Sequence, residues 1–463
     1  MTELPRRHDA LRFPPGFLFG AAAAAFQIEG GAKEDGRTPS IWDTFCRVPG
    51  KVHHGDDGEI ACDHYHRLEQ DLDLIEELGL DSYRFSIAWP RVMPDGGSTV
   101  NQKGLDFYRR LTDGLRARGV KAMATVYHWD LPQRLQDSGG WRSRDTAFRM
   151  AEMAATVGAA LHDSVDFWVT MNEPWCSSFI GYLEGRHAPG EQTLQGAIEA
   201  SHHLLVAHGL ATQALRAAGI AGEVGITLNL SDVHAATQAP DDVAAAERID
   251  GNENRWFLDP LHGRGYPVDM LAWYADRADL EALNDDDLEL IATPLDFFGI
   301  NYYEQHRVVA NPDDPIHGAR KLPPEPPVTD YGIGVRPQGF AAVLRRVACD
   351  YTALPLYVTE NGATYNDYLG PDGEVRDTER VEYLHLHLTA ARQLIDEGID
   401  LRGYYAWSLM DNFEWAEGYS RRFGLVFVEF GTQRRVMKSS AKWYQALIAS
   451  QSGWLDRTAA LGS

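Results

Sequence analysis

Eight short runs of apolar, β-branched and aromatic residues recur along the 463-residue chain, and this repeat constrains the fold more than any other feature. Each run is hydrophobic almost throughout rather than alternating, which is typical of strands buried on both faces of a parallel sheet. The runs cover residues 16–27, 82–89, 121–129, 166–174, 222–230, 295–303, 355–362 and 401–409.

Stretches with helical periodicity separate most of these runs. Residues 64–78 place Leu68, Leu72 and Ile75 on one face, and Gly79 follows as a stop signal. Similar patterns cover residues 103–118, 143–162, 193–218, 338–350 and 378–397. Eight alternations of strand and helix predict an α/β fold, a single (β/α)₈ TIM barrel with long loops after its strands, because a doubly wound open sheet more often has fewer strands.

No linker interrupts the series, so we expect one domain over residues 1–463. The Pro-rich stretch 310–338 follows the sixth predicted strand, and its position favours a long active-site loop over an interdomain tether.

The charge balance and the cysteines restrict the partners and the compartment. Lys and Arg total 43 against 67 Asp and Glu, a net charge of -24, so a nucleic acid or an anionic membrane is not expected as a partner. The first residues lack the apolar segment of a secretory signal and no later run could span a bilayer, which predicts a cytoplasmic protein. Cys46, Cys62, Cys176 and Cys349 form no CxxC motif, so we expect reduced thiols.

Polar residues end most of the predicted strands. Active sites of (β/α)₈ barrels lie at the carboxyl ends of the strands, so these residues are candidates for function. They are Gln27, Glu29, Arg84, His128, Trp129, Asn172, Glu173, Asn229, Asn301, Tyr303, Glu360, Asn361 and Trp407.

Two of these ends present a carboxylate in a tight motif, Glu173 in TMNEP and Glu360 in VTENG. A glutamate taken alone is more often a surface or salt-bridged residue, but two at strand ends can face each other across the barrel mouth. Glycoside hydrolysis requires such a pair, about 5–5.5 Å apart for retention of configuration or roughly 6.5–9.5 Å for inversion.

These motifs, together with FLFGAAAAAFQIEGG, YRFSIAWPR, YHWDLPQ, GINYY and WSLMDNFEWAEGYSRRFGLV, resemble the family 1 glycoside hydrolases from about residue 12 to 450. The resemblance implies a retaining β-glucosidase with Glu173 as general acid/base and Glu360 as nucleophile. It also implies that Arg84, Asn301 and Tyr303 support these two groups. The substrate would be a small β-glycoside or oligosaccharide, with no cofactor and no metal, and homo-oligomer formation is left open.

The resemblance also implies a subsite for the reacting sugar and its leaving group. Its residues would be Gln27, His128, Trp129, Asn172, Trp175, Trp407, Glu414, Trp415 and Phe423. Amide, imidazole and carboxylate groups bind sugar hydroxyls, whereas indole rings pack against the apolar face of a pyranose. Asn172 would contact the 2-hydroxyl. Ile333 stands where the family usually carries a tryptophan of the leaving-group platform, so the leaving-group preference stays open.

Three alternatives remain at this level. A 6-phospho-β-glycosidase is disfavoured because Glu414, expected at the 4- and 6-hydroxyls and followed by Trp415, would repel a phosphate. A non-catalytic carbohydrate-binding barrel typically loses one of the two carboxylates, and both are kept. A metal-dependent hydrolase is disfavoured because His64 and His66 open a predicted helix rather than end a strand. A glucosyl substrate is the default, and galactosyl or fucosyl substrates are open.

Overall fold

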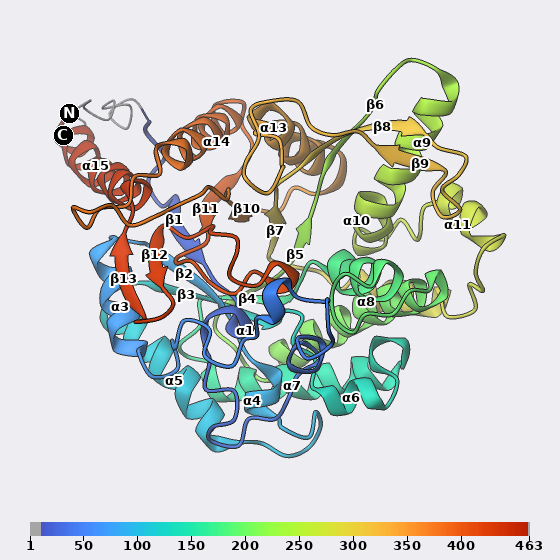
Figure 1. Cartoon of the computed structure of the whole chain (residues 1–463), viewed down its shortest axis with the longest axis horizontal. Coiled ribbons are helices and arrows are strands. Elements are labelled where there is room, and N and C mark those ends of the chain that lie inside the picture. The colour runs from blue at the N-terminus through green and yellow to red at the C-terminus, as the bar shows by residue number, and fades with distance from the viewer. Residues whose placement is uncertain (1–10, 462–463) are drawn as a thin grey trace.

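The computed structural model describes residues 11–461, with side chains described as far as residue 451, and its centre is a closed barrel of eight parallel strands (Figure 1). The barrel strands are β1 (Leu18–Ala22), β2 (Ser82–Ser86), β3 (Lys121–Tyr127), β4 (Phe167–Asn172), β5 (Glu223–Asn229), β7 (Phe297–Asn301), β10 (Leu356–Asn361) and β11 (Leu401–Trp407). Each predicted run contains one of them, so the predicted fold class is confirmed.

The barrel closes where β1 pairs with both β2 and β11. Gly20 pairs with Tyr405 in the β1–β11 register, and a side chain at Gly20 would collide with the Tyr405 ring. The strands are almost wholly buried, as their continuous hydrophobicity predicted.

Helices surround the strands, as Figure 1 shows. Those that follow barrel strands in the predicted positions are α3 (Leu68–Glu77), α5 (Gln102–Ala117), α7 (Asp145–Leu161), α8 (Leu194–Ala217), α13 (Pro337–Arg346) and α14 (Thr378–Asp396). The remaining α-helices are α1 (Ala25–Ile28), α2 (Ile41–Phe45), α4 (Trp89–Val92), α6 (Gln133–Asp137), α9 (Pro240–Asp250), α10 (Trp256–Leu261), α11 (Val268–Ala275), α12 (Leu288–Ile291) and α15 (Ser439–Leu461).

The prediction of a helix beginning at residue 64 was wrong, because α3 begins at Leu68. The backbone at Ala61 and Asp63 has positive φ values of 50° and 54°, so the chain is still turning there. His64 precedes the helix and its imidazole contacts the Asp71 carboxylate at 2.8 Å.

Two small sheets lie outside the barrel and were not predicted. β6 (Asp232–Ala235), β8 (Gln305–Ala310) and β9 (Ala319–Lys321) form a three-stranded sheet beside α9, and β12 (Val426–Glu429) pairs with β13 (Arg434–Met437) in a hairpin near α15 (Figure 1). The Pro-rich stretch 310–338 therefore contains β9 as well as loop, and it ends in the first residues of α13.

The ends of the described chain lie together. Nη1 of Arg12 donates to Oγ of Ser450 at 3.1 Å, which ties the start of the barrel to α15. Within residues 11–461, we find no helix that combines the length and the apolar character needed to cross a membrane.

Candidate active site

A cavity of about 250 Å³ opens at the carboxyl ends of the barrel strands. It brings together most of the predicted site residues: His128, Trp129, Glu173, Trp175, Asn301, Tyr303, Glu360, Trp407, Glu414, Trp415 and Phe423 line it. Gln27, Arg84 and Asn172 are not among its lining residues, but each hydrogen-bonds to a residue that is.

Irregular strand pairing places both carboxyls in this cavity. Glu173 follows the last residue of β4, where the register with β5 shifts, and its φ of 48° lies in the left-handed region. Glu360 lies near the end of β10, where the register with β7 also shifts. Such irregularities re-aim side chains, and strained backbone of this kind gathers at functional sites.

Glu360 has charged and hydroxyl partners. Nη1 of Arg84 donates to its Oε1 at 2.5 Å, and the Tyr303 hydroxyl donates to its Oε2 at 2.8 Å. Arg84 is itself fixed, because Nη1 also donates to the Thr359 carbonyl and Nη2 donates to Oδ1 of Asn172.

Glu173 has uncharged partners. Nδ2 of Asn301 donates to its Oε1 at 2.6 Å, and the Cys176 thiol lies 3.2 Å from its Oε2. Nδ2 of Asn301 also donates to Oδ1 of Asn172 at 3.0 Å, which in turn accepts from Arg84, so this carboxamide connects Glu173 to the groups that hold Glu360.

Burial, followed by the negative charge of Glu360, raises the pKa of Glu173 to about 8. Burial also raises the pKa of Glu360, but Arg84 and the hydrogen bond from Tyr303 oppose that rise. The proton that two close acids share therefore belongs on Glu173, because the cation stabilises the ionised form of its neighbour.

A polar layer behind the cavity wall connects these groups. Oδ1 of Asn172 accepts hydrogen bonds from Arg84 and Asn301, and its Nδ2 lies 3.1 Å from Nε2 of His128. Burial, followed by the charge of Arg84, lowers the pKa of His128 well below its usual value, so the imidazole is neutral.

Gln27 and Glu414 form a second polar group. Nε2 of Gln27 donates to Oδ1 of Asn412 at 3.0 Å, to the Phe413 carbonyl at 2.8 Å and to Oε2 of Glu414 at 3.4 Å. Oε1 of Gln27 is buried and has no hydrogen-bond partner among residues 11–461. Burial, followed by the charge of Glu360, raises the pKa of Glu414 to about 8. Glu414 thus carries less negative charge at neutral pH than its sequence alone indicated.

Aromatic rings form one wall of the cavity. The Trp415 ring lies 4.6 Å from that of Trp129, and the His128 ring is stacked 6.0 Å from both Trp407 and Trp415. Nε1 of Trp129 donates to the Asn172 carbonyl at 3.1 Å, which fixes this indole against the polar layer.

The outer part of the cavity includes residues that the sequence did not reveal. Lys321 on β9 pairs with Glu253 at 2.5 Å, and its Nζ lies 3.0 Å from Nε2 of His306 on β8. Tyr331 and Ile333 of the Pro-rich stretch also line the cavity, which agrees with the predicted role of this stretch as an active-site loop. Sequence spacing does not indicate that β8, β9 and the barrel mouth meet.

Cys176 was predicted as a reduced thiol and not as a site residue, although it follows Glu173 by three positions. The three-residue interval could have indicated this contact, because residues three apart share one face of a helical turn.

Two predicted strand-end residues are structural rather than part of the cavity. Glu29 accepts hydrogen bonds from Arg91 at 2.8 Å and from the Tyr108 hydroxyl at 2.5 Å. The Asn361 carboxamide contacts the carbonyl of Tyr302 and the hydroxyl of Tyr383. In both cases, structural hydrogen bonds account for a polar residue at the end of a buried strand, and no role in binding is needed.

A parallel barrel that carries two buried carboxyls, sugar-sized aromatic surfaces and fixed amide groups at its carboxyl end has the site of a glycoside hydrolase. Comparison with known proteins agrees. The model of Glycosyl hydrolase family 1 matches residues 9–453, and the chain belongs to this family.

Relatives of known name cover nearly the whole chain. A β-glucosidase of Agrobacterium sp. is 47% identical over 447 residues, which cover 95% of this chain and 96% of that protein. A bifunctional β-D-glucosidase/β-D-fucosidase of Bifidobacterium breve is 44% identical over 461 residues, covering 95% and 99%. The crystal structure of a family 1 β-glucosidase from Exiguobacterium antarcticum is 42% identical, has a TM-score of 0.92, and covers 96% of this chain and 99% of its own.

Proposed function

We propose that this chain acts, as one catalytic barrel, as a retaining β-glucosidase that removes the non-reducing terminal glucosyl residue of small β-glycosides and cello-oligosaccharides. The contrast between the two carboxyls carries the proposal. Glu360 has a guanidinium and a hydroxyl as partners, whereas an amide and a thiol contact Glu173. A retaining mechanism requires this difference between an ionised nucleophile and a protonated acid.

In the first step, an oxygen of Glu360 attacks the anomeric carbon while the bond from that carbon to the leaving-group oxygen breaks. Glu173 gives its proton to the departing oxygen. The products are a glycosyl ester on Glu360, a free alcohol and the ionised carboxylate of Glu173.

In the second step, Glu173 accepts a proton from water, and the water oxygen attacks the anomeric carbon as the ester bond breaks. The charge of Glu360 contributes to the raised pKa of Glu173, and the ester removes that charge. The pKa of Glu173 therefore falls in the intermediate, which suits its change from acid to base.

Recognition of the sugar rests on the polar and aromatic groups around these acids. Oε1 of Gln27 is free to accept from a sugar hydroxyl, and Glu414 lies beside it for the 4- and 6-hydroxyls. Trp407 and Trp415 offer flat surfaces to the pyranose ring. Asn172, fixed between Arg84 and His128, is proposed to contact the 2-hydroxyl.

The names of the relatives support a glucosyl substrate, and the B. breve relative adds a fucosyl one. Fucose differs from glucose at the 4- and 6-positions, so its acceptance depends on Gln27 and Glu414. The leaving group is proposed to contact Trp175, whose Nε1 is held by Oδ1 of Asn252 at 2.9 Å, and Ile333 at the cavity mouth.

Two measurements test this function. A panel of nitrophenyl β-glucoside, β-galactoside and β-fucoside should give the highest kcat/KM with the glucoside. Proton NMR of the first product formed from the glucoside should show the β anomer before mutarotation. An α anomer as the first product, or no hydrolysis of any β-glycoside, would contradict the proposal.

A further inference from the structure

Residues 408–425, which follow β11, carry Glu414, Trp415 and Phe423, three groups assigned above to the substrate. Within this segment, which is fully described, regular structure is limited to the β-bridge of Met410 with Val426 and the short 3-10 turn Trp415–Glu417. Trp415 has a φ of 49°, a backbone conformation that bulky residues rarely adopt. The conformation of the segment therefore depends on side-chain contacts, both within the segment and with its surroundings.

Asp411 connects the start of this segment to its end. Its buried carboxylate accepts hydrogen bonds from the backbone N–H of Gly424 at 3.0 Å and of Val428 at 3.4 Å. The same carboxylate pairs with Nη1 of Arg422 at 2.6 Å. One side chain at the start of the segment thus holds the residues at its end.

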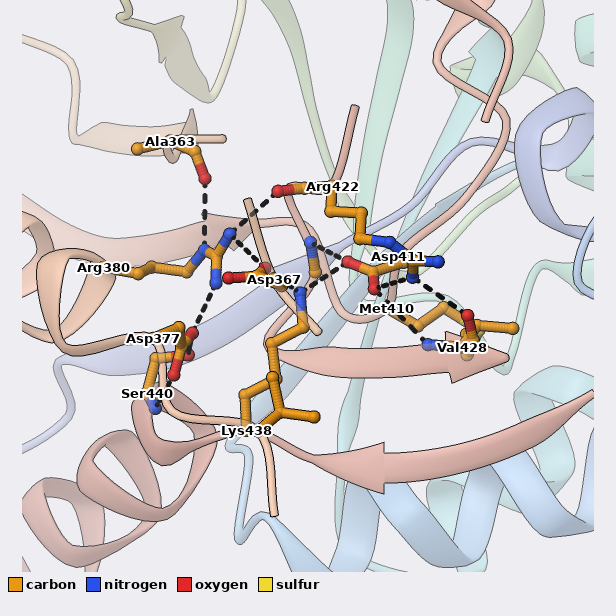
Figure 2. Close-up of polar contacts among 12 residues, drawn as sticks. Ala363, Asp367, Asp377, Arg380, Met410, Asp411, Arg422, Val428, Lys438 and Ser440 are labelled. Carbon is orange, nitrogen blue, oxygen red and sulfur yellow. Dashed lines mark hydrogen bonds and ion pairs between the residues drawn. The ribbon is translucent and has the colours of Figure 1, made fainter. Parts of the chain in front are cut away.

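Lys438 forms a buried ion pair with Asp411. Its side chain is fully buried, and its Nζ lies 2.6 Å from Oδ1 of Asp411 and 2.6 Å from Oδ2 of Asp367. Lys438 follows the last residue of β13, and Figure 2 shows its side chain between these two carboxylates. Its backbone N–H also donates to the Leu425 carbonyl at 3.1 Å.

Arg380 extends the network to the loop after β10. Its guanidinium pairs with Asp367 at 2.7 Å and donates to the carbonyls of Ala363 and Arg422 (Figure 2). Ala363 lies three residues after Glu360. The network therefore joins the loop that follows the nucleophile to the segment that carries the sugar-binding groups.

Asn412 connects this network to Gln27. Asn412 follows Asp411, and its Oδ1 accepts the hydrogen bond from Nε2 of Gln27 that places this amide beside Glu414. Burial of Asp411 and Lys438 makes each depend on the other, because a buried charge without its partner is strongly unfavourable. Without the Lys438 ammonium, the buried Asp411 carboxylate would lose an ion-pair partner. Its contacts between the start and the end of residues 408–425 would then weaken.

We propose that Lys438 is a positioning residue, which acts through Asp411 and Asn412 to set Gln27 and Glu414 for the 4- and 6-hydroxyls of the sugar. The inference rests on the sugar-binding assignments of the proposed function. Lys438 itself touches neither the cavity nor the reacting atoms.

The test compares Lys438→Met with Lys442→Met. Lys442 lies one helical turn further along α15, where its exposed ammonium pairs with Glu374, so it serves as the matched control. Values of kcat and KM are measured with a nitrophenyl β-glucoside and with its 4,6-dideoxy analogue, which lacks both hydroxyls. A 2-fluoro glucoside counts the active sites in each sample.

For Lys438→Met, kcat/KM for the glucoside should fall on the order of tenfold relative to the 4,6-dideoxy analogue, because misplacement of a binding group by a fraction of an ångström has effects of this size. The ratio should stay at the wild-type value in Lys442→Met. An equal loss for both substrates in Lys438→Met would overturn the inference, since a purely structural role predicts that result.

If Lys438→Met yields no folded protein, Asp411→Asn provides the test. This change keeps the shape of the side chain but removes the charge through which Lys438 acts, so a fall of the same ratio is expected. An unchanged ratio in folded Asp411→Asn would overturn the inference. A wild-type protein that hydrolyses the glucoside separates this failure from a failure of the proposed function.

Discussion

Nη1 of Arg84 lies 2.5 Å from Oε1 of Glu360, and both side chains are buried. A buried cation at this distance favours the ionised form of Glu360. Glu173 shares the cavity, and the charge of Glu360 helps to raise its pKa. The different roles proposed for the two glutamates follow from this one ion pair.

Glu173→Ala should affect substrates according to their leaving groups. We expect kcat/KM to fall about 10²–10⁴-fold for alkyl glucosides, which need a proton on the departing oxygen, and less for a dinitrophenyl glucoside. Azide should restore turnover of the dinitrophenyl substrate and give a β-glucosyl azide, because the shortened side chain leaves room for the anion. Kinetics with both substrates and NMR of the azide product check this, and an equal loss for both would contradict it.

The pH dependence of kcat/KM should report the pKa of Glu173 in the free enzyme. Since that pKa is about 8, activity should fall about tenfold per pH unit at higher pH, as the catalytic proton is lost. The hydrogen bond from Cys176 lowers this pKa, so Cys176→Ala should move the alkaline limb to higher pH. Cys176→Ser keeps a donor and is the control. A shift of the Cys176→Ala limb to lower pH would show that the thiol does not donate to Glu173.

Ile333→Trp should change the preference for the leaving group. Ile333 and Trp175 both line the cavity mouth, and an added indole would offer a flat aryl group a second ring surface. Aromatic pairs contribute about 0.5–1.5 kcal/mol, so KM for a nitrophenyl glucoside should fall roughly two- to tenfold. Methyl β-glucoside is the control and should keep its KM. An equal change for both substrates would argue against a contact with the leaving group.

Glu29→Ala should destabilise the fold without a direct effect on recognition. It leaves the Arg91 guanidinium buried without its carboxylate, a loss of about 3–5 kcal/mol in the free energy of unfolding. Urea unfolding measures this change. Glu59→Ala removes an exposed pair with Lys33 and should have little effect. Similar midpoints for the two variants would contradict the structural role of Glu29.

The barrel could be predicted from the sequence because its strands are buried on both faces and read as continuous apolar runs. Helices α10 to α12 gave weaker signals because they have only 6, 8 and 4 residues and Pro260 lies inside α10. Helix α9 is longer but buries only Ala245, Ala246 and Ile249. β6 has no buried residue, and β8 and β9 bury only His306, Val308 and Ala319, so these strands lack the continuous apolar runs of the barrel.

The inner part of the site was likewise predictable, because polar residues such as Glu173 and Glu360 end apolar strands. Its outer part was not, because Lys321 and Glu253 are 68 residues apart and meet through the folding of β9 against a helical segment. Glu29 had the same sequence signal as Gln27 but serves Arg91 instead of the cavity. Strand-end position selects candidates, and contacts decide between binding and structure.

The role of Glu360 as nucleophile is tested most directly by mass spectrometry after incubation with a 2-fluoro glucoside carrying a good leaving group. The fluorine slows both steps, and the activated leaving group allows the first step to proceed, so the covalent intermediate accumulates. We expect one fluoroglucosyl label on the peptide that contains Glu360, and none in Glu360→Ala. A label on Glu173, or inactivation without any covalent adduct, would contradict it.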